Sequence, residues 1–136
     1  MQIDCPPSLG LLTVNALNAA NGLLVPVQVE YYALAGLALI RQTAELVRDL
    51  NPDLEILGLV LTFFDARKTL NKDVAAALAD EWGDALFSTR IRDNVSLAEA
   101  PSNGQDVFSY KRGSYGAKDY AAFAAEFLER TEGCYG

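Results

Sequence analysis

Apolar residues along the chain follow two periods, one typical of buried strands and one typical of helices. Continuous apolar runs at residues 22–29 and 54–64, and a weaker run at 85–89, predict strands that are covered on both faces. Between these runs, apolar residues recur every three or four positions, as on one face of a helix. This order predicts an α/β fold with a mostly parallel sheet flanked by helices.

Helices are predicted before, between and after these strands. The second helix ends before Asn51-Pro52, and the third is capped by Asn71 and stops at Gly83. The positions that define their apolar faces, from the first helix to the last, are Leu11, Val14, Leu17, Leu37, Ile40, Ala44, Val47, Val74, Leu78, Tyr120, Phe123, Ala124, Phe127 and Leu128. The segment from Arg90 to Ala117 contains Pro101 and several glycines, so we expect a long loop with a functional role.

The first ten residues carry the clearest chemical signal. Residues 1–4 are expected to form the end of a buried strand, and Asp4 then projects a carboxylate into a loop shaped by Pro6, Pro7 and Gly10. In nucleotide-hydrolysing α/β proteins, an acid at this end of a central strand holds the metal near the phosphates. The alternative is structural: Asp4 caps the helix that begins near Leu9, and the prolines and glycine shape a turn.

The phosphate-binding loop that such an acid requires does not occur in this sequence. No G-x-x-x-x-G-K-[ST] motif or related glycine-rich loop with a lysine is present among the 136 residues. The sequence therefore predicts half of a nucleotide site.

Composition limits the class of protein further. With 136 residues, 51% hydrophobic and 21% charged, residues 1–136 are expected to form one ordered domain. The net charge of -7 argues against a general nucleic-acid binder, although a local basic patch is compatible with it. No apolar run approaches the roughly 20 residues that span a bilayer, so no membrane association is expected.

Cysteine and histidine usage points to a reduced, cytoplasmic protein. The two cysteines, Cys5 and Cys134, lie near opposite ends of the chain, which makes a disulfide framework improbable. Histidine is absent, and this excludes histidine-based catalytic triads and histidine metal ligands.

Several blocks of sequence, in order and with consistent spacing, resemble one family. The blocks are I-D-C-P-P-S-L-G-L-L-T-V-N-A-L, V-P-V-Q-V-E-Y-Y-A-L-A-G-L, L-N-P-D-L-E-I-L-G-L-V-L-T-F-F-D-A-R, N-V-S-L-A-E-A-P-S-N-G and S-Y-G-A-K-D-Y. From Ile3 to about Leu128, they resemble the C-terminal half of the ParA/Soj chromosome and plasmid partition ATPases, relatives of MinD. The resemblance implies a partial P-loop NTPase fold of the deviant Walker type.

The same resemblance implies partners and cofactors for the intact family. Its members bind Mg and ATP, form ATP-sandwiched dimers, bind DNA non-specifically and are stimulated by a ParB-like protein; they associate with the nucleoid. Their N-terminal half carries K-G-G-x-G-K-[ST], which has no counterpart here. We therefore expect no cofactor and no ATPase activity for this chain alone. A natural truncation, an internal start and a cloned fragment all remain open.

The resemblance also assigns candidate nucleotide-site residues. It places Asp4, Pro6, Pro7 and Gly10 near the phosphates, with Asp4 reaching Mg through water only when nucleotide is present. It places Phe64, Asp65, Ile91, Arg92 and Asp93 on the adenine side. The alternatives are a strand-end ion pair or cap for Asp65 with Arg67, and a solvated charge pair for Arg92 with Asp93. Glu30, Tyr31 and Tyr32 fit either surface aromatic packing or a dimer face.

A weak basic segment supplies the DNA-binding candidates. Residues 88–118 carry a net charge of +2 against -9 for the remainder, and their cations are Arg90, Arg92, Lys111, Arg112 and Lys118. This asymmetry fits a basic edge on an acidic protein, but ordinary fluctuation also explains it. Tyr115 stands where relatives more often have a basic residue, so the DNA contacts do not transfer directly.

Three functions stay open at this point. The chain is an enzyme part that is inactive until the other half is supplied. Alternatively, it is a truncated binding module or regulator that contacts a partner chain, a ParB-like protein or DNA without catalysis, or a remnant without selected function. In each case we expect an exposed sheet edge beside the Asp4 strand, and hence self-association or homodimer formation.

Overall fold

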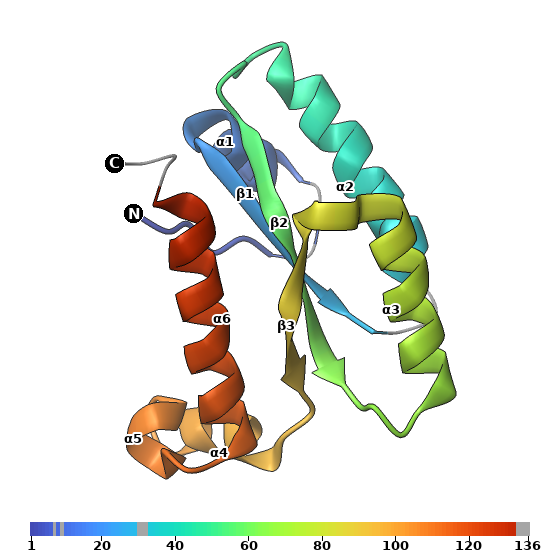
Figure 1. The fold of residues 1–136 in the computed structure, drawn as a ribbon. Coiled ribbons are helices and arrows are strands. Elements are labelled where there is room, and N and C mark those ends of the chain that lie inside the picture. Colours follow the sequence, from blue (N-terminus) through green and yellow to red (C-terminus); the bar gives the residue numbers. More distant parts are fainter. Residues whose placement is uncertain (7, 9, 30–32, 133–136) are drawn as a thin grey trace.

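The computed structural model describes residues 1–6, 8, 10–29 and 33–132, and it contains one parallel sheet (Figure 1). The strands are β1 (Gly22–Gln28), β2 (Glu55–Phe64) and β3 (Leu86–Arg92), in the spatial order β1-β2-β3. The predicted α/β class and the strands predicted at residues 22–29, 54–64 and 85–89 are confirmed, and β3 extends to Arg92. Among the described residues, no helix is long and apolar enough to cross a membrane.

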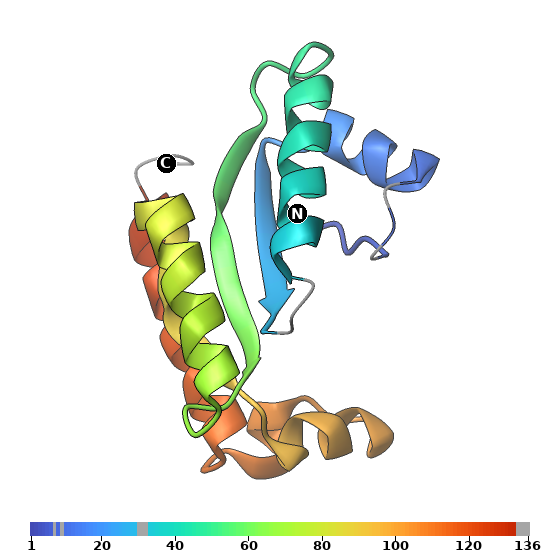
Figure 2. The ribbon, with the colours of Figure 1, turned by 90° about the vertical axis from the view of Figure 1, so that its right-hand side faces the viewer.

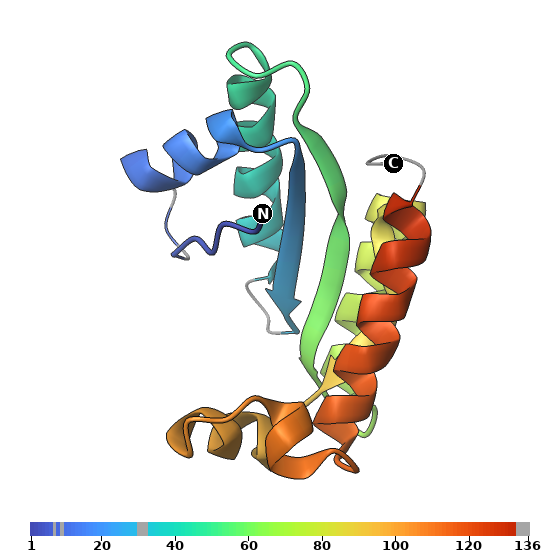
Figure 3. The ribbon, with the colours of Figure 1, turned by 90° about the vertical axis from the view of Figure 1, so that its left-hand side faces the viewer.

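Helices cover both faces of this sheet. They are α1 (Leu11–Ala19), α2 (Ala33–Arg48), α3 (Thr69–Trp82), α4 (Val95–Ser102), α5 (Val107–Lys111) and α6 (Tyr115–Thr131), with a short 3-10 turn at Gly83–Ala85. The crossover helices α2 and α3 lie on one side of the sheet and α6 lies on the other, as Figures 2 and 3 show. Each predicted helix is therefore present.

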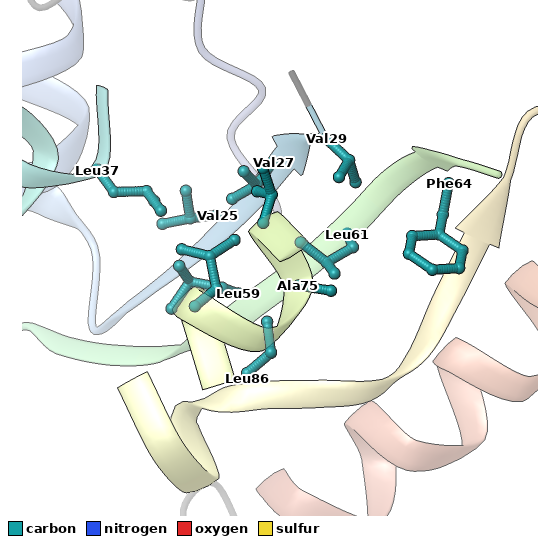
Figure 4. Close-up of a cluster of buried hydrophobic side chains, with 11 residues drawn as sticks. Val25, Val27, Val29, Leu37, Leu59, Leu61, Phe64, Ala75 and Leu86 are labelled. Carbon is teal, nitrogen blue, oxygen red and sulfur yellow. The ribbon is translucent and has the colours of Figure 1, made fainter. Parts of the chain in front are cut away.

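The larger core fills the space between β1, β2 and the crossover helices (Figure 4). Leu59 and Leu61 of β2 and Leu78 of α3 have no exposed surface, and Leu37 brings α2 onto the same cluster. Full burial of such a side chain stabilises the fold by about 1.5–3 kcal/mol. This packing fixes where β1 and β2 end, and so positions the edge discussed below.

Aromatic rings fill the opposite face of the sheet. Phe87 of β3 packs edge-on against Phe123 of α6, with ring centroids 5.0 Å apart, and lies stacked on Phe127 at 6.3 Å. Tyr120 and Leu128 of the predicted stripe remain exposed, because they lie on the part of α6 that turns away from β3. The apolar face of α6 is thus narrower than its sequence suggests.

Two irregularities shape β2. Gly58 adopts φ +151° opposite a register shift, and a Cβ there would lie 2.6 Å from the Ala85 carbonyl oxygen. Phe63 adopts φ +55°, a left-handed conformation that is unfavourable for a bulky side chain. Its position coincides with a register shift between Leu61 and Phe64, so the carboxyl end of β2 is bent locally.

The predicted strand at the N-terminus is wrong. Residues 1–6 are exposed and lie in no strand, because no described strand pairs with them and a lone strand has no ladder to join. The edge of the sheet on this side is therefore β1 and not the Asp4 segment. The capping alternative for Asp4 is also wrong: the N-cap of α1 is Gly10, without a side-chain cap hydrogen bond.

The segment from Arg90 to Ala117 is not a long loop. It contains α4 and α5, each begun by a capping side chain that the prediction passed over. The Asn94 carboxamide accepts from the Ser96 amide at 3.2 Å, and the Asp106 carboxylate accepts from the Phe108 amide at 2.8 Å. Asn71, predicted as a cap, lies inside α3 instead, and the N-cap of that helix is Lys68.

Candidate site at the carboxyl edge of the sheet

Because the three strands are parallel, their carboxyl ends meet at one edge of the sheet. In open α/β sheets, ligands bind at this edge. Five of the predicted site residues lie there: Phe64, Asp65, Ile91, Arg92 and Asp93. The structure therefore brings together the residues expected on the adenine side of a nucleotide.

Asn71 ties the ends of β1 and β2 to each other. It is 5% exposed, its Oδ1 accepts from the Asp65 amide at 2.8 Å, and its Nδ2 donates to the Val29 carbonyl at 3.2 Å. A buried amide with both ends paired fixes the relative position of the two strand ends. The sequence offered a signal, a polar residue among the inward positions of α3, but the residue type favoured a cap.

Asp65 and Arg67 form the strand-end ion pair that was one of the two interpretations. The Arg67 guanidinium donates to both Asp65 carboxylate oxygens, at 3.0 and 2.9 Å, and lowers the pKa of Asp65 to about 2. The Arg67 side chain remains 90% exposed. Asp65 is therefore ionised at the end of β2, with its own side chain only 18% exposed.

Phe64 lies inside the core, not on the surface. Its ring is part of the cluster between β2 and α3, and the Arg90 guanidinium lies over it, 4.5 Å from the ring centroid. Ile91 is likewise buried, at 2% exposure. Because both side chains are buried, a ligand at this edge would contact their backbone atoms and the neighbouring exposed residues instead.

Arg92 is held by Asp119 of α6, and the alternative of a charge pair with Asp93 is wrong. Its backbone amide, Nε and Nη2 donate to the Asp119 carboxylate at 3.0, 2.9 and 2.6 Å. Burial would raise the pKa of Asp119, but the hydrogen bonds from Arg92 outweigh burial and lower it. The guanidinium also lies 4.1 Å from the Tyr115 ring centroid. Arg92 thus fixes the start of α6 against the end of β3.

Phe63 is a residue of this edge that sequence reasoning missed. It combines the left-handed conformation with a side chain that is 58% exposed. Backbone strain of this kind costs on the order of 1–3 kcal/mol and clusters at functional sites. No sequence pattern marks it, and its position coincides with the register shift between Leu61 and Phe64.

The N-terminal candidates lie apart from any built site. Asp4 and Pro6 are exposed, and Asp4 makes no hydrogen bond or ion pair with another described residue. Pro7 and the Glu30-Tyr31-Tyr32 segment lie outside the described residues. Across the described ranges, no three His, Cys, Asp or Glu side chains come together as a metal site. The residues present therefore do not by themselves fit a magnesium ion.

Three of the remaining basic candidates, Lys111, Arg112 and Lys118, lie around the start of α6. Lys118 Nζ lies 5.9 Å from the Tyr115 ring, while Lys111 and Arg112 are exposed at the end of α5. With Arg90, these are the candidates that form no ion pair with a described carboxylate. Arg92 differs, because Asp119 neutralises it.

A second cluster, also missed from the sequence, closes the outer edge of β3. The Glu126 carboxylate accepts from the Ser88 and Thr89 amides, both at 2.8 Å, and from Arg130 at 2.7 Å. Burial alone would raise its pKa, but these hydrogen bonds lower it to about 2. Arg130 also donates to the Asp84 and Leu86 carbonyls. α6 therefore satisfies this edge of the sheet.

Comparison with known proteins assigns the family relationship. The chromosome-partitioning protein ParA of Caulobacter vibrioides is 45% identical over 129 residues, which is 94% of this chain and 48% of that protein. The chromosome-partitioning ATPase Soj of Thermus thermophilus is 47% identical over 131 residues, 96% of this chain and 53% of that protein. This chain is a relative of the ParA/Soj partition proteins. It spans about half the length of the curated relatives that it matches.

Two further comparisons agree with the ParA/Soj relationship. Residues 1–56 match the family model described as AAA domain. A crystal structure of cobyrinic acid a,c-diamide synthase from Mycobacterium smegmatis with bound ADP and magnesium has a TM-score of 0.72 and 33% identity. That similarity covers 96% of this chain and 46% of the synthase. The nucleotide and the metal are properties of the synthase.

Proposed function

We propose that this chain forms part of a ParA/Soj-type partition ATPase domain and that, alone, it neither binds ATP tightly nor hydrolyses it. The observation that carries the proposal is the 45% identity to ParA over 129 residues, combined with the absence of a phosphate-binding loop from the 136 residues. The carboxyl edge of the sheet then serves as the nucleoside side of a site completed by residues outside this sequence.

Physical chemistry explains why this part is insufficient. A phosphate-binding loop holds a triphosphate with consecutive backbone N–H groups and a helix N-terminus. A lysine and magnesium then stabilise the charge that develops during phosphoryl transfer. Magnesium itself is usually held by one or two carboxylates together with the substrate phosphates. Asp4 therefore acts on magnesium, through water, only once another segment holds the nucleotide.

The test is ATP turnover by the purified 136-residue chain with magnesium, beside Thermus thermophilus Soj as the positive control. We expect turnover indistinguishable from buffer for this chain. Turnover above background that Asp4→Ala abolishes, and that Asp53→Ala, a variant of an exposed acid outside the candidate site, retains, contradicts the proposal. Turnover that survives Asp4→Ala is compared with a mock purification from cells that lack this chain. Equal turnover in the mock assigns the activity to a contaminant, and turnover absent from the mock also contradicts the proposal.

A second candidate function is a binding module that acts without catalysis. The exposed side chains of Lys111, Arg112 and Lys118 around the start of α6, and of Arg90 on β3, favour it, because exposed cations offer phosphate contacts. DNA retention at 50 mM salt without ATP, weakened by Lys111→Glu with Arg112→Glu but not by Lys72→Glu, supports this candidate. A few contacts in a protein of charge -7 predict weak and strongly salt-dependent binding.

The partners of the intact family also remain proposals for this chain. A ParB-like protein, non-specific DNA and a place on the nucleoid follow from the ParA/Soj relationship. Self-association of the isolated chain through its exposed sheet edge is expected at about 100 μM, where unpaired edges commonly associate. Light scattering that shows a clean monomer at that concentration contradicts self-association.

A further inference from the structure

Neighbouring backbone amides of β3 face opposite sides of the strand. The Asp93 amide, directly after β3, donates to the Phe64 carbonyl of β2 at 3.3 Å. Because backbone direction alternates along an extended chain, the Arg92 amide faces the outer side, away from β2. There it donates to the Asp119 carboxylate of α6 at 3.0 Å. This outer amide therefore finds its partner in a side chain and not in another strand.

Two further side chains of α6 contact the earlier part of β3. The Glu126 carboxylate accepts from the Ser88 and Thr89 amides, both at 2.8 Å, where the register between β2 and β3 shifts. Arg130 donates to the Leu86 carbonyl at 3.2 Å. We call the backbone groups of β3 that α6 occupies in this way the β3 edge. Carboxylates meet its amides and a guanidinium meets its carbonyl, and charged hydrogen bonds of this kind are strong.

The spacing of the three α6 side chains matches the length of strand that they cover. Asp119, Glu126 and Arg130 are separated by seven and four residues, so they share one side of the helix at intervals of roughly 10 and 6 Å. Their backbone partners, from Arg92 through residues 88–89 to Leu86, lie roughly 12 and 8 Å apart along an extended strand. α6 runs antiparallel to β3, as Figure 1 shows, so the order of the contacts agrees.

Among the described residues, the opposite edge of the sheet has no such cover. No described strand pairs with the outer side of β1, and its sequence from Gly22 to Gln28 contains no charged residue. The Val29 amide donates to the Thr62 carbonyl of β2, so the Gln28 amide before it faces outward. Pro26 removes one donor from this outer row. An unpaired edge is a template for pairing with another chain, so β1 can add to a free edge elsewhere.

We propose that α6 keeps β1 of a second copy from pairing with the β3 edge. All three strands are parallel, so β1 of another copy adds beside β3 in the direction that the sheet already has. Such a contact is heterologous, because each copy uses β3 toward one neighbour and β1 toward the other, and it repeats into open-ended chains. While α6 occupies the β3 edge, only the β1 edges of two copies are free, and self-association ends at a dimer. The inference goes beyond the proposed function and does not depend on it.

The test compares Glu126→Ala with Glu129→Ala in the full 136-residue chain at about 100 μM, by analytical ultracentrifugation. Both variants remove one negative charge from α6, but Glu126 contacts β3 and Glu129 is exposed. We expect wild type and Glu129→Ala to form nothing larger than dimers. Glu126→Ala should form species beyond the dimer, with a weight-average mass roughly twofold higher or more. In those species, hydrogen exchange at the Ser88 and Thr89 amides should slow as the protein concentration rises.

Two additional variants identify the pairing strand and control for loss of the fold. Gln28→Pro removes an outward amide of β1, so adding it to Glu126→Ala should return the protein to dimers or monomers. If circular dichroism shows that Glu126→Ala is unfolded, Arg130→Met takes its place, with the same expected masses. That variant frees the Leu86 carbonyl and keeps an aliphatic side chain over the Phe87 ring, where the Arg130 guanidinium lies 4.2 Å from the ring centroid.

Three outcomes overturn the inference. The first is a folded variant with an open β3 edge whose mass distribution equals that of Glu129→Ala. The second is the formation of larger species in which the Ser88 and Thr89 amides exchange as fast as in the monomer, because association then occurs elsewhere. The third is the persistence of larger species after Gln28→Pro, because the strand that pairs with β3 is then not β1.

Discussion

Arg92 and Asp119 form a bidentate ion pair that joins the end of β3 to the start of α6. The Asp119 side chain is 11% exposed and receives Nε and Nη2 of Arg92 at 2.9 and 2.6 Å. Paired geometry of this kind is stronger than a single charged hydrogen bond. It also means that Arg92, a candidate for nucleotide and DNA contact, is occupied within the fold.

Replacing Asp119 tests this relationship. Asp119→Asn removes the charge that holds Arg92, and we expect a loss of about 2 kcal/mol in the free energy of unfolding, because half of Arg92 stays hydrated. Urea denaturation measures it. Asp93→Asn, an exposed acid next to Arg92, is the control and should change stability by less than about 0.5 kcal/mol. Equal effects of the two variants contradict the role given to Asp119.

Glu126 makes stability depend on acid pH. Its pKa is lowered to about 2 in the folded protein, against 4.5 for the ordinary group, so its ionised form stabilises the fold. This contribution is fully present above about pH 5 and is lost as the pH falls from there toward 2, because the unfolded chain binds the proton first. The shift corresponds to on the order of 3 kcal/mol.

The Glu126→Gln variant separates this effect from general acid denaturation. At neutral pH it should unfold at lower urea concentration than the wild type, and the difference should shrink as the pH approaches 2. Glu129→Gln, an exposed glutamate on the same helix, should behave as wild type throughout. A Glu126→Gln difference that is constant between pH 7 and pH 2.5 rules out the proposed titration.

Asn71 is expected to stabilise the fold through hydrogen bonds at both the oxygen and the nitrogen of its side-chain amide. Asn71→Ala leaves the Asp65 amide and the Val29 carbonyl without their partner, and unpaired buried groups cost about 1–3 kcal/mol. Thermal or urea unfolding should show this loss, and Lys72→Ala, its exposed neighbour on α3, should not. Unchanged stability of Asn71→Ala would show that water satisfies both groups.

The pattern of apolar residues predicted the sheet well, because strands that are covered on both faces of a sheet consist of continuous apolar runs. The run at residues 54–64 became β2 almost unchanged. Residues 1–4 failed because strand formation needs a neighbour, and the described part of the chain supplies none. Local sequence encodes the tendency of a segment to be extended, but its partner is a property of the whole fold.

The sequence predicted where the candidate site residues lie more successfully than it predicted which residues they contact. The predicted strand ends placed Asp65, Arg92 and Asp93 at one edge, because the carboxyl ends of parallel strands lie at the same edge of a sheet. The partners of those residues come from far along the chain: Asp119 lies 27 residues after Arg92, and Asn71 bridges to Val29 across 42 residues. No periodicity encodes such pairs, and none marks the left-handed backbone conformation of Phe63.

Isothermal titration calorimetry of ATP and magnesium into the isolated 136-residue chain tests the central claim most directly. The sequence holds no backbone cradle for the phosphates, so we predict no heat of binding beyond dilution at millimolar ATP, while Thermus thermophilus Soj in the same cell gives a saturable signal. A saturable isotherm for the isolated chain with micromolar affinity would contradict the account.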